Sequence, residues 1–592
     1  MSHLSKIIGI LGLLITVVFT GSFLDTYNFI KFIVLILGTT YILVFWISEK
    51  GYLALKNQIN KPPIYFLSIL IIINCLSAIT NGINYEVLFG TYGRQMGLIS
   101  IFCLILISIM SLSVDSKESI LKYLSIALTI SNLYGLFQFM GIDIYKFEKL
   151  YDGINSTFGN PNFAGGAAAV SAVLYLHYFV ESKKKAHKII FSVLLFISFI
   201  NIYGSLARQA YLTVIFGFCI YGYKWISSKP RNLKFSYLGF LAFSSVFTLL
   251  GMLQKGPLKT LVYKESISER GDFYRTAITT IKNNLFFGVG PDQFGTFYRI
   301  YRDVKQVSRT GINTTSDSAH NSLLHFGATS GIFAMLVLFL IYVWVVKNQA
   351  KVFFSSPTRA VTFSIWIVMS LQNMISVDHP SLSYWWWVVT ALLIQNSHNE
   401  VTALKKHKIP KLNDRVILSH GFGFIGLIVI AIILVPQFRS QTLLFRGFTT
   451  PIDLENQETI NYKRSLFESA YNSSPRNFEI YRFGANSFYQ DGDFNSAVIL
   501  SRKALEIQPN DYPSAWFLAE SLTKLGKEKE SILAWQKVSK LDPLNFRNHF
   551  ELGKLLAKSD ISRAKIELSQ SLKLYPDEKT KEETIRLLAS IS

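Results

Sequence analysis

Thr315-Ser316-Asp317-Ser318-Ala319-His320-Asn321 ends a long polar region that begins at residue 254 and separates two apolar segments. The same region contains Glu269-Arg270, a helical pattern over 272–285 and the turn Gly288-Val289-Gly290-Pro291. Because apolar segments of this length can cross a bilayer, they form a scaffold that is able to hold the polar region at a membrane surface. We therefore predict that residues 254–320 form an insert on one side of a membrane.

The composition predicts an all-α, polytopic membrane protein. Half of the 592 residues are apolar and only 16% are charged. Repeated apolar runs of about 18 residues or more are typical of membrane helices. The first run follows Lys6 and lacks a small-residue cleavage site, so we interpret it as a helix and not as a removed signal peptide. We expect about 12–13 spans, near 5–24, 28–48, 64–80, 97–113, 120–140, 161–180, 188–204, 207–227, 235–253, 320–346, 359–377, 381–396 and 416–437.

The formal charge of +21 does not indicate a nucleic-acid partner. Residues 455–592 contain 20 Lys and Arg against 19 Asp and Glu, so the excess lies among the apolar spans. Clusters of Lys and Arg in the connections between membrane spans determine which side of the membrane each connection lies on. Cys75, Cys103 and Cys219 lie within apolar spans and match neither a disulfide framework nor a metal-site spacing. We expect no nucleic acid and no metal.

The positions of the basic clusters predict the topology. Every strong cluster follows an even-numbered span, which places the N-terminus in the cytoplasm and the odd connections outside. The insert and everything after the thirteenth span are then extracytoplasmic. The insert is itself basic. Long loops are not bound by the positive-inside rule, so this charge does not contradict an extracytoplasmic location. We expect the basic residues to bind an anionic ligand. The clusters are Lys50, Lys56 and Lys61; Lys183, Lys184, Lys185 and Lys188; Lys224, Lys229, Arg231 and Lys234; Lys347, Lys351 and Arg359; and Lys405, Lys406, Lys408, Lys411 and Arg415.

The C-terminal region contains a repeat of about 34 residues. Pro475, Pro509, Pro543 and Pro576 are spaced 34, 34 and 33 apart, each after a pattern of aromatic and small residues. This period is typical of tetratricopeptide repeats, in which helices pair and proline ends the second helix. We predict a membrane domain over 1–440, a linker over 441–454 and a half repeat with three repeats over 455–592. The repeats could bind a protein partner or act only as a stabilising appendage.

Six polar residues from five separate connections fall on one predicted face of the membrane. A histidine there can act as a general base, and arginine suits phosphate oxygens. Taken singly, each residue could instead be a helix cap or an anchor at the membrane surface. Their common side makes them candidates for a site. They are Arg94, Asn160, Arg208, Arg270, His320 and Asp378.

Several short motifs occur together in a fixed order. They are Ser156-Thr157-Phe158-Gly159-Asn160-Pro161-Asn162, the Ser205 to Arg208 turn, Arg270 with Tyr274, Gly288-Val289-Gly290 and Ala319-His320-Asn321. Over roughly residues 85–400 the chain resembles the O-antigen ligase family, which includes protein O-oligosaccharyltransferases and relatives of O-antigen polymerases.

The resemblance implies a metal-independent glycosyltransferase of the bacterial inner membrane that needs no cofactor. Its donor would be a polyprenyl-pyrophosphate-linked glycan, and its acceptor a hydroxyl on a lipid, protein or polymer outside the cytoplasm. Arg208 and Arg270 would hold the pyrophosphate and His320 would act on the acceptor. Further substrate-binding candidates are Arg94, Asn160, Arg275, Asn321 and Asp378. A polymerase of lipid-linked units, or a transporter or flippase with a regulatory solenoid, remains an alternative.

Overall fold

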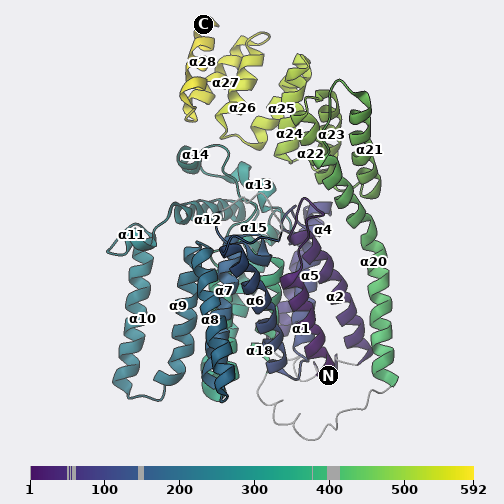
Figure 1. Ribbon diagram of the computed structural model, residues 1–592. Coiled ribbons are helices and arrows are strands. Elements are labelled where there is room, and N and C mark those ends of the chain that lie inside the picture. The colour runs from purple at the N-terminus through teal and green to yellow at the C-terminus, as the bar shows by residue number, and fades with distance from the viewer. Residues whose placement is uncertain are drawn as a thin grey trace.

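The computed structural model describes residues 2–49, 52, 53, 55, 62–144, 152–376, 378–395 and 414–591. Within these ranges the regular secondary structure is helical. A bundle of long helices forms one half of the molecule, and a solenoid of short helices lies beyond one end of it (Figure 1). The predicted all-α fold, a membrane bundle followed by a helical-pair solenoid, is confirmed.

Every predicted span contains a helix. Eight of the described helices are long and apolar enough to cross a membrane, and α1, α5 and α18 add shorter apolar helices. This confirms a multi-pass membrane protein. The bundle helices are α1 (Ser2–Val17), α2 (Asn28–Ser48), α3 (Pro62–Thr80), α5 (Leu98–Ser111), α6 (Lys117–Phe139), α7 (Pro161–Glu181), α8 (Lys185–Gly204), α9 (Arg208–Ile226), α10 (Arg231–Met252), α15 (Ser322–Ser330), α16 (Ile332–Val352), α17 (Pro357–Asn373), α18 (Pro380–Ile394) and α20 (Asp414–Thr449).

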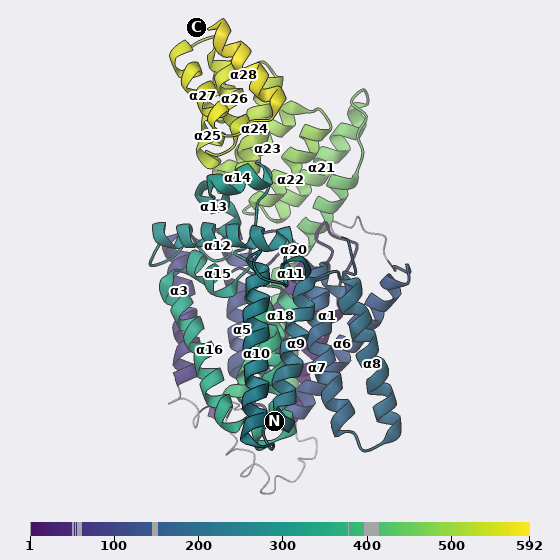
Figure 2. The same ribbon diagram turned by 90° about the vertical axis from the view of Figure 1, so that its left-hand side faces the viewer.

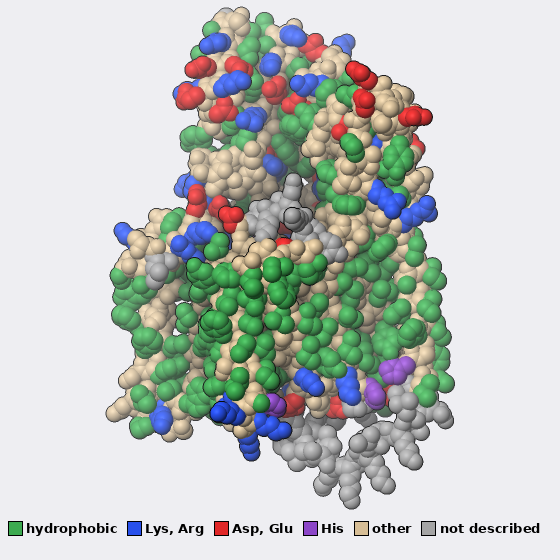
Figure 3. Space-filling model, in the orientation of Figure 1, with side chains coloured by type: hydrophobic (Ala, Val, Ile, Leu, Met, Phe, Trp, Pro, Cys, Tyr) green, Lys and Arg blue, Asp and Glu red, His purple; other side chains and the backbone are tan. Residues whose placement is uncertain are grey.

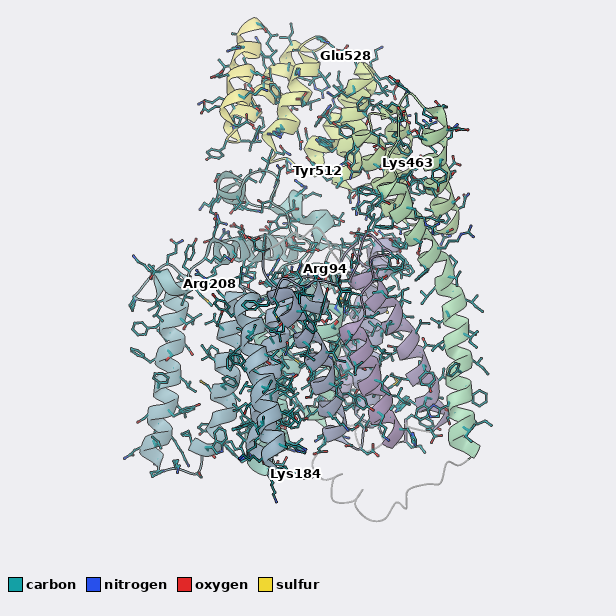
Figure 4. All side chains as sticks on the ribbon, in the orientation of Figure 1. Arg94, Lys184, Arg208, Lys463, Tyr512 and Glu528 are labelled. Carbon is teal, nitrogen blue, oxygen red and sulfur yellow. The ribbon has the colours of Figure 1, made fainter. Side chains whose placement is uncertain are left out.

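A broad apolar belt covers the face of the bundle seen in Figure 3, with blue basic residues at its lower edge. Helix α10 buries only Gly251 and exposes Phe235, Phe240 and Phe243, which suits a lipid-facing surface. Lys184 lies at the opposite end of the bundle from Arg94 and Arg208 (Figure 4). This separation agrees with the prediction that the basic clusters after even-numbered spans lie at the opposite membrane face from the candidate site residues. Which end faces the cytoplasm stays a prediction. Lys50, Lys56, Lys61, Lys405, Lys406, Lys408 and Lys411 lie outside the described residues.

The predicted span at 320–346 is two helices. Gly331, with φ at +92°, ends α15 and precedes α16. A Cβ at this position would lie 2.0 Å from the carbonyl oxygen of Phe286, so only glycine fits. The break leaves His320 in the loop before α15 and not on a continuous membrane helix. The apolar pattern across 320–346 concealed this break because both halves are apolar.

The insert forms α11 (Lys259–Val262), α12 (Glu265–Asn283), α13 (Phe294–Tyr301) and α14 (Val304–Thr310). Helix α12 begins earlier than the predicted residue 272 and lies across the end of the bundle (Figures 1 and 2). Its buried Phe273, Ala277 and Ile281 form one apolar cluster with Ala328 of α15. This packing fixes the insert on the bundle.

The C-terminal repeats fold as predicted. A first helix is followed by three helix pairs and a last helix, and a proline stands in the connection after α21, α23, α25 and α27. Gly553 shows why small residues recur, because a Cβ there would lie 2.7 Å from Cγ of Leu568 in the paired helix. The helices are α21 (Gln457–Ser473), α22 (Phe478–Gln490), α23 (Phe494–Ile507), α24 (Tyr512–Lys524), α25 (Glu528–Leu541), α26 (Phe546–Leu556), α27 (Ile561–Lys573) and α28 (Glu578–Ser590).

Helix α20 connects the bundle to the solenoid. It continues through Pro436 to Thr449, so the predicted limit at residue 440 falls inside a helix. At about 1.5 Å per residue, its 36 residues span roughly 54 Å. The solenoid therefore lies over the same end of the bundle as the insert (Figure 2). The domain limits 1–440, 441–454 and 455–592 remain a proposal.

The solenoid docks on the insert through charged groups. Asp542 accepts hydrogen bonds from Arg299 at 2.8 Å and from Arg302 at 2.7 Å. In the insert itself, Arg275 and Arg309 form ion pairs with Asp272. Four of the arginines that we attributed to an anionic ligand thus have carboxylate partners. That interpretation of the insert's charge was too broad, since it ignored partners distant in sequence.

A second contact joins the solenoid to α4 (Tyr85–Phe89) and to the loop that follows it. Gln508 donates to Glu86 at 2.8 Å, and the backbone N–H of Tyr92 donates to Glu479 at 2.8 Å. Burial raises the pKa of Glu86 to about 7, although the hydrogen bonds that Thr296 and Gln508 donate to this carboxylate lower it. Burial, and after it the Glu86 carboxylate, raises the pKa of Glu479 to about 8, although the nearby Arg482 lowers it.

We expect this contact to weaken as the pH rises from 6 to 9. Both pKa values lie above those of exposed glutamates, so the docked state binds protons that the undocked state releases. The stabilisation is complete at low pH and is lost as the pH passes through about 7 to 8. Hydrogen exchange of residues 85–92, corrected for intrinsic rates, measures it. Glu86→Gln with Glu479→Gln should flatten the response, and equal protection of the wild type at both pH values would contradict the prediction.

Candidate functional site

A cleft of about 1010 Å³ opens between the insert and the adjoining end of the bundle. Its walls come from six parts of the chain: residues 24–28, 92–94, 155–163, 264–273, 314–320 and 378–379. Five predicted site residues line it together: Arg94, Asn160, Arg270, His320 and Asp378. Arg208, Arg275 and Asn321 are not among the lining residues.

His320 lies in the loop before α15 with φ at +52°, a backbone conformation that is costly for a residue other than glycine. Its ring stacks on Phe273 with centroids 4.9 Å apart. Its buried Nδ1 has no hydrogen-bond partner among the described residues. Burial, and after it the positive charges of Arg270 and Arg94, lowers the pKa of His320 to about 3. The imidazole is therefore neutral at pH 7, and it can act as a base only where its surroundings raise this pKa.

Arg270 comes from α12 and is held by neutral groups. Its Nε donates to the carbonyl of Ile375 at 2.8 Å, Nη1 to that of Ser266 at 3.1 Å, and Nη2 to Oε1 of Gln209 at 2.9 Å. No ion pair to Arg270 occurs within the described part of the chain. Burial lowers its pKa, yet a guanidinium stays charged at neutral pH. A charge so placed favours an anion in the cleft.

Arg94 is also in the cleft wall, but its charge is already matched. Its Nε lies 3.2 Å from Oδ1 of Asp292, and both side chains are buried. Nη1 donates to the backbone carbonyl of Asp317 at 3.2 Å. Asp292 also accepts hydrogen bonds from the backbone N–H groups of Thr91 and Met96. Arg94 therefore fixes the loop that leads to His320 and contributes little free positive charge.

Asn160 and Asp378 have defined local roles at the cleft edge. Asn160 caps α7, because its side chain accepts from the backbone N–H of Asn162 at 2.8 Å. Asp378 accepts a hydrogen bond from the hydroxyl of Ser322 at 2.8 Å, which links α18 to the start of α15. Both side chains keep polar atoms that can contact a substrate, since each residue lines the cleft.

The other three predicted residues serve the frame of the site. Exposed Arg208, the first residue of α9, donates to the carbonyl of Tyr263 and so holds the segment that leads into α12. Arg275 is half exposed and paired with Asp272. Asn321 caps α15 by accepting from the N–H of Leu324 at 3.1 Å. Their motifs mark the region around the site, but the side chains of these three residues do not line the cleft.

Two further residues, Lys264 and His379, line the cleft. Lys264 precedes α12 and lines the cleft near Arg270. His379 packs against Phe158 and Phe163, and its buried Nε2 has no hydrogen-bond partner within the described residues. Nothing in the local pattern marks Lys264 among the many lysines of the insert. His379 follows Asp378 at the same predicted membrane face, and for that reason the sequence makes it a secondary candidate together with Asp378.

Residues 193–340 match the family model described as O-antigen ligase. The matched stretch runs from α8 into α16 and contains Arg208, Arg270 and His320. For this part of the chain the match confirms the resemblance predicted from the motifs, and it supports a membrane glycosyltransferase-like function. No curated protein gives a significant match.

Two solved structures align with the chain. The Cut9–Hcn1 hetero-tetramer of the APC/C aligns at 11% identity and a TM-score of 0.22, over 93% of this chain and 90% of that chain. Yeast Tom70 aligns at 11% identity and a TM-score of 0.22, over 83% and 88%. At such scores the alignments establish neither fold nor function.

Proposed function

We propose that this protein transfers a glycan from a polyprenyl diphosphate to an acceptor hydroxyl at the outer face of a bacterial cytoplasmic membrane. The observation that carries the proposal is the cleft in which Arg270 and His320 meet at one end of an apolar bundle; among the described residues Arg270 has no carboxylate partner and Nδ1 of His320 has no hydrogen-bond partner. The family match over residues 193–340 supports it.

Arg270 and Lys264 would bind the diphosphate. Arg270 now donates to two carbonyls and one amide, so a phosphate oxygen would give it a stronger, charge-assisted partner. Arg208 would keep both cations in place through the carbonyl of Tyr263. The polyprenyl tail would lie along the apolar belt of the bundle. We thus assign Arg208 to positioning and not to direct phosphate contact.

The chemistry would exchange one carbon–oxygen bond for another. The acceptor oxygen attacks the anomeric carbon, and the bond from that carbon to the diphosphate oxygen breaks with its electron pair leaving on the diphosphate. The guanidinium of Arg270 stabilises the charge that develops there. The acceptor proton goes to His320, whose pKa of about 3 would rise when a diphosphate neutralises the nearby guanidinium groups.

The test is transfer by the purified full chain in lipid nanodiscs. A fluorescent glycan on a polyprenyl diphosphate is supplied with a lipid, peptide or polymer acceptor in separate reactions. Appearance of the label on one acceptor, with release of the polyprenyl diphosphate, is the expected result. Label that appears only on longer lipid-linked glycans would identify a polymerase, and movement of intact donor between leaflets without transfer would identify a flippase.

A further inference from the structure

A second hollow lies between the solenoid and the insert, away from the cleft. It has a volume of about 530 Å³ and lies on the side of the solenoid that faces α13. Three alternate helices of the solenoid contribute to it, α24 through Tyr512 and Trp516, α26 through Asn548 and Phe550, and α28 through Glu583. The insert closes it with Arg299, Ile312 and Asn313. We call this hollow the solenoid groove.

The lining combines aromatic faces with planar polar groups. Tyr512, Trp516 and Phe550 supply flat apolar surfaces, and Tyr512 carries the guanidinium of Arg299 at 4.3 Å from its ring centre. Asn545 donates to the hydroxyl of Tyr512 and Asn548 accepts from it, which fixes this ring, and the exposed Asn313 supplies amide donors and acceptors at the rim. A sugar ring has one apolar face and a rim of hydroxyl groups, so it matches both kinds of surface.

The charges of the solenoid groove favour a neutral ligand over an acidic one. Two of its cations are already paired, Arg299 with Asp542 at 2.8 Å and Arg547 with Asp577 at 3.5 Å. Burial, and after it the neighbouring Glu551, raises the pKa of Glu520, which shifts it towards its neutral form. An acidic peptide would therefore find little free positive charge.

Consecutive residues of one loop line the solenoid groove and the cleft, so the two hollows lie next to each other. Ile312 and Asn313 line the groove, and the next residues, 314–317, line the cleft. Arg302 holds this loop by donating to the carbonyls of Ile312 at 2.9 Å and Thr314 at 3.3 Å. A chain whose first unit is held in the cleft can therefore pass this loop and enter the groove.

We propose that the solenoid groove binds the saccharide chain of the substrate at sugars distant from the reacting bond. This inference rests on the proposed function, because it identifies the chain by its attachment to a donor in the cleft. The groove would make the enzyme select long glycans, since a short donor would fill the cleft and leave the groove empty.

The test compares donors of two lengths with the full chain in nanodiscs. For Trp516→Ala we expect kcat/KM to fall about ten-fold with a long-chain donor, mainly through KM, and to stay unchanged with a single-unit donor. Trp516→Phe should retain most of the selectivity. Glu520→Ala is a second variant that leaves the aromatic core intact, and Tyr462→Ala, on exposed α21, is the matched control. Equal losses with both donors would overturn the proposal.

Calorimetry with the released, lipid-free glycan separates this proposal from the proposed function. Binding that is lost in Trp516→Ala, in a protein that fails to transfer, would support the groove and reject the transferase. Transfer without such binding would reject the groove alone. Lysine-rich peptide is the competing probe, because Glu520, Glu551 and Glu583 line the groove. Trp516-dependent binding of that peptide in place of glycan would overturn the proposal.

Discussion

Alanine in place of Arg270 or of His320 is expected to reduce glycan transfer by about 100- to 1000-fold, the loss typical of removing one stabilising donor from an active site. Arg270 is the cleft guanidinium that lacks a carboxylate partner among the described residues, so its loss leaves Lys264 without the second cation that would hold the diphosphate. His320 offers the unpartnered Nδ1 that would take the acceptor proton. The initial rate of label transfer in nanodiscs measures both effects.

Matched controls separate catalysis from folding. Arg275 is on the same helix as Arg270 but forms an ion pair with Asp272 outside the cleft, so Arg275→Ala should retain most of the transfer. His187 is exposed on α8 at the opposite end of the bundle, and His187→Ala should be unaffected. Arg270→Ala and His320→Ala should keep normal amounts of folded protein in the membrane. Full transfer by either variant would remove that residue from the mechanism.

The sequence predicted the helices well because each depends on local pattern. Apolar runs located every span, and proline spacing located every repeat of the solenoid. The positive-inside rule brought Arg94, Arg270 and His320 to one face before any contact was known, and all three line the cleft. The break at Gly331 was missed, because the reason for it is the close approach of Phe286 from a distant segment.

The partners of charged residues could not be predicted from the sequence. Arg275 and Arg302 are similar basic residues of one insert, yet one pairs within its own helix and the other with Asp542, 240 residues away. Lys264 enters the cleft only because Arg208 anchors the preceding residue, Tyr263. The pair with Asp542 depends on how the solenoid docks, and the place of Lys264 depends on the contact between Arg208 and Tyr263; no local pattern encodes either of them.

Asp542→Ala is expected to release the solenoid from the insert and to lower transfer at least ten-fold, although Asp542 is outside the cleft. The side chains of Asp542 and Arg302 are fully buried, and two hydrogen bonds join them at 2.7 and 2.9 Å. Removing the carboxylate leaves a buried guanidinium unpaired, which costs about 3–5 kcal/mol. Arg302 also holds the carbonyls of Ile312 and Thr314, at the start of the loop that leads to His320. Hydrogen exchange over residues 300–320 measures the loosening, with Glu582→Ala on exposed α28 as the control.

A double variant distinguishes docking from control of the loop. Arg302→Met with Asp542→Leu removes both buried charges together, and such replacements are often neutral or stabilising. Docking, measured by exchange over residues 542–550, should then recover. Transfer should stay low, because the carbonyl of Thr314 loses its donor Arg302 and the carbonyl of Ile312 keeps only the longer hydrogen bond from Arg299, at 3.3 Å, within the described residues. Recovery of transfer together with docking would mean that the solenoid acts by its presence and not through this arginine. Full transfer by Asp542→Ala, despite faster exchange, would show that the loop with His320 holds its conformation without the solenoid.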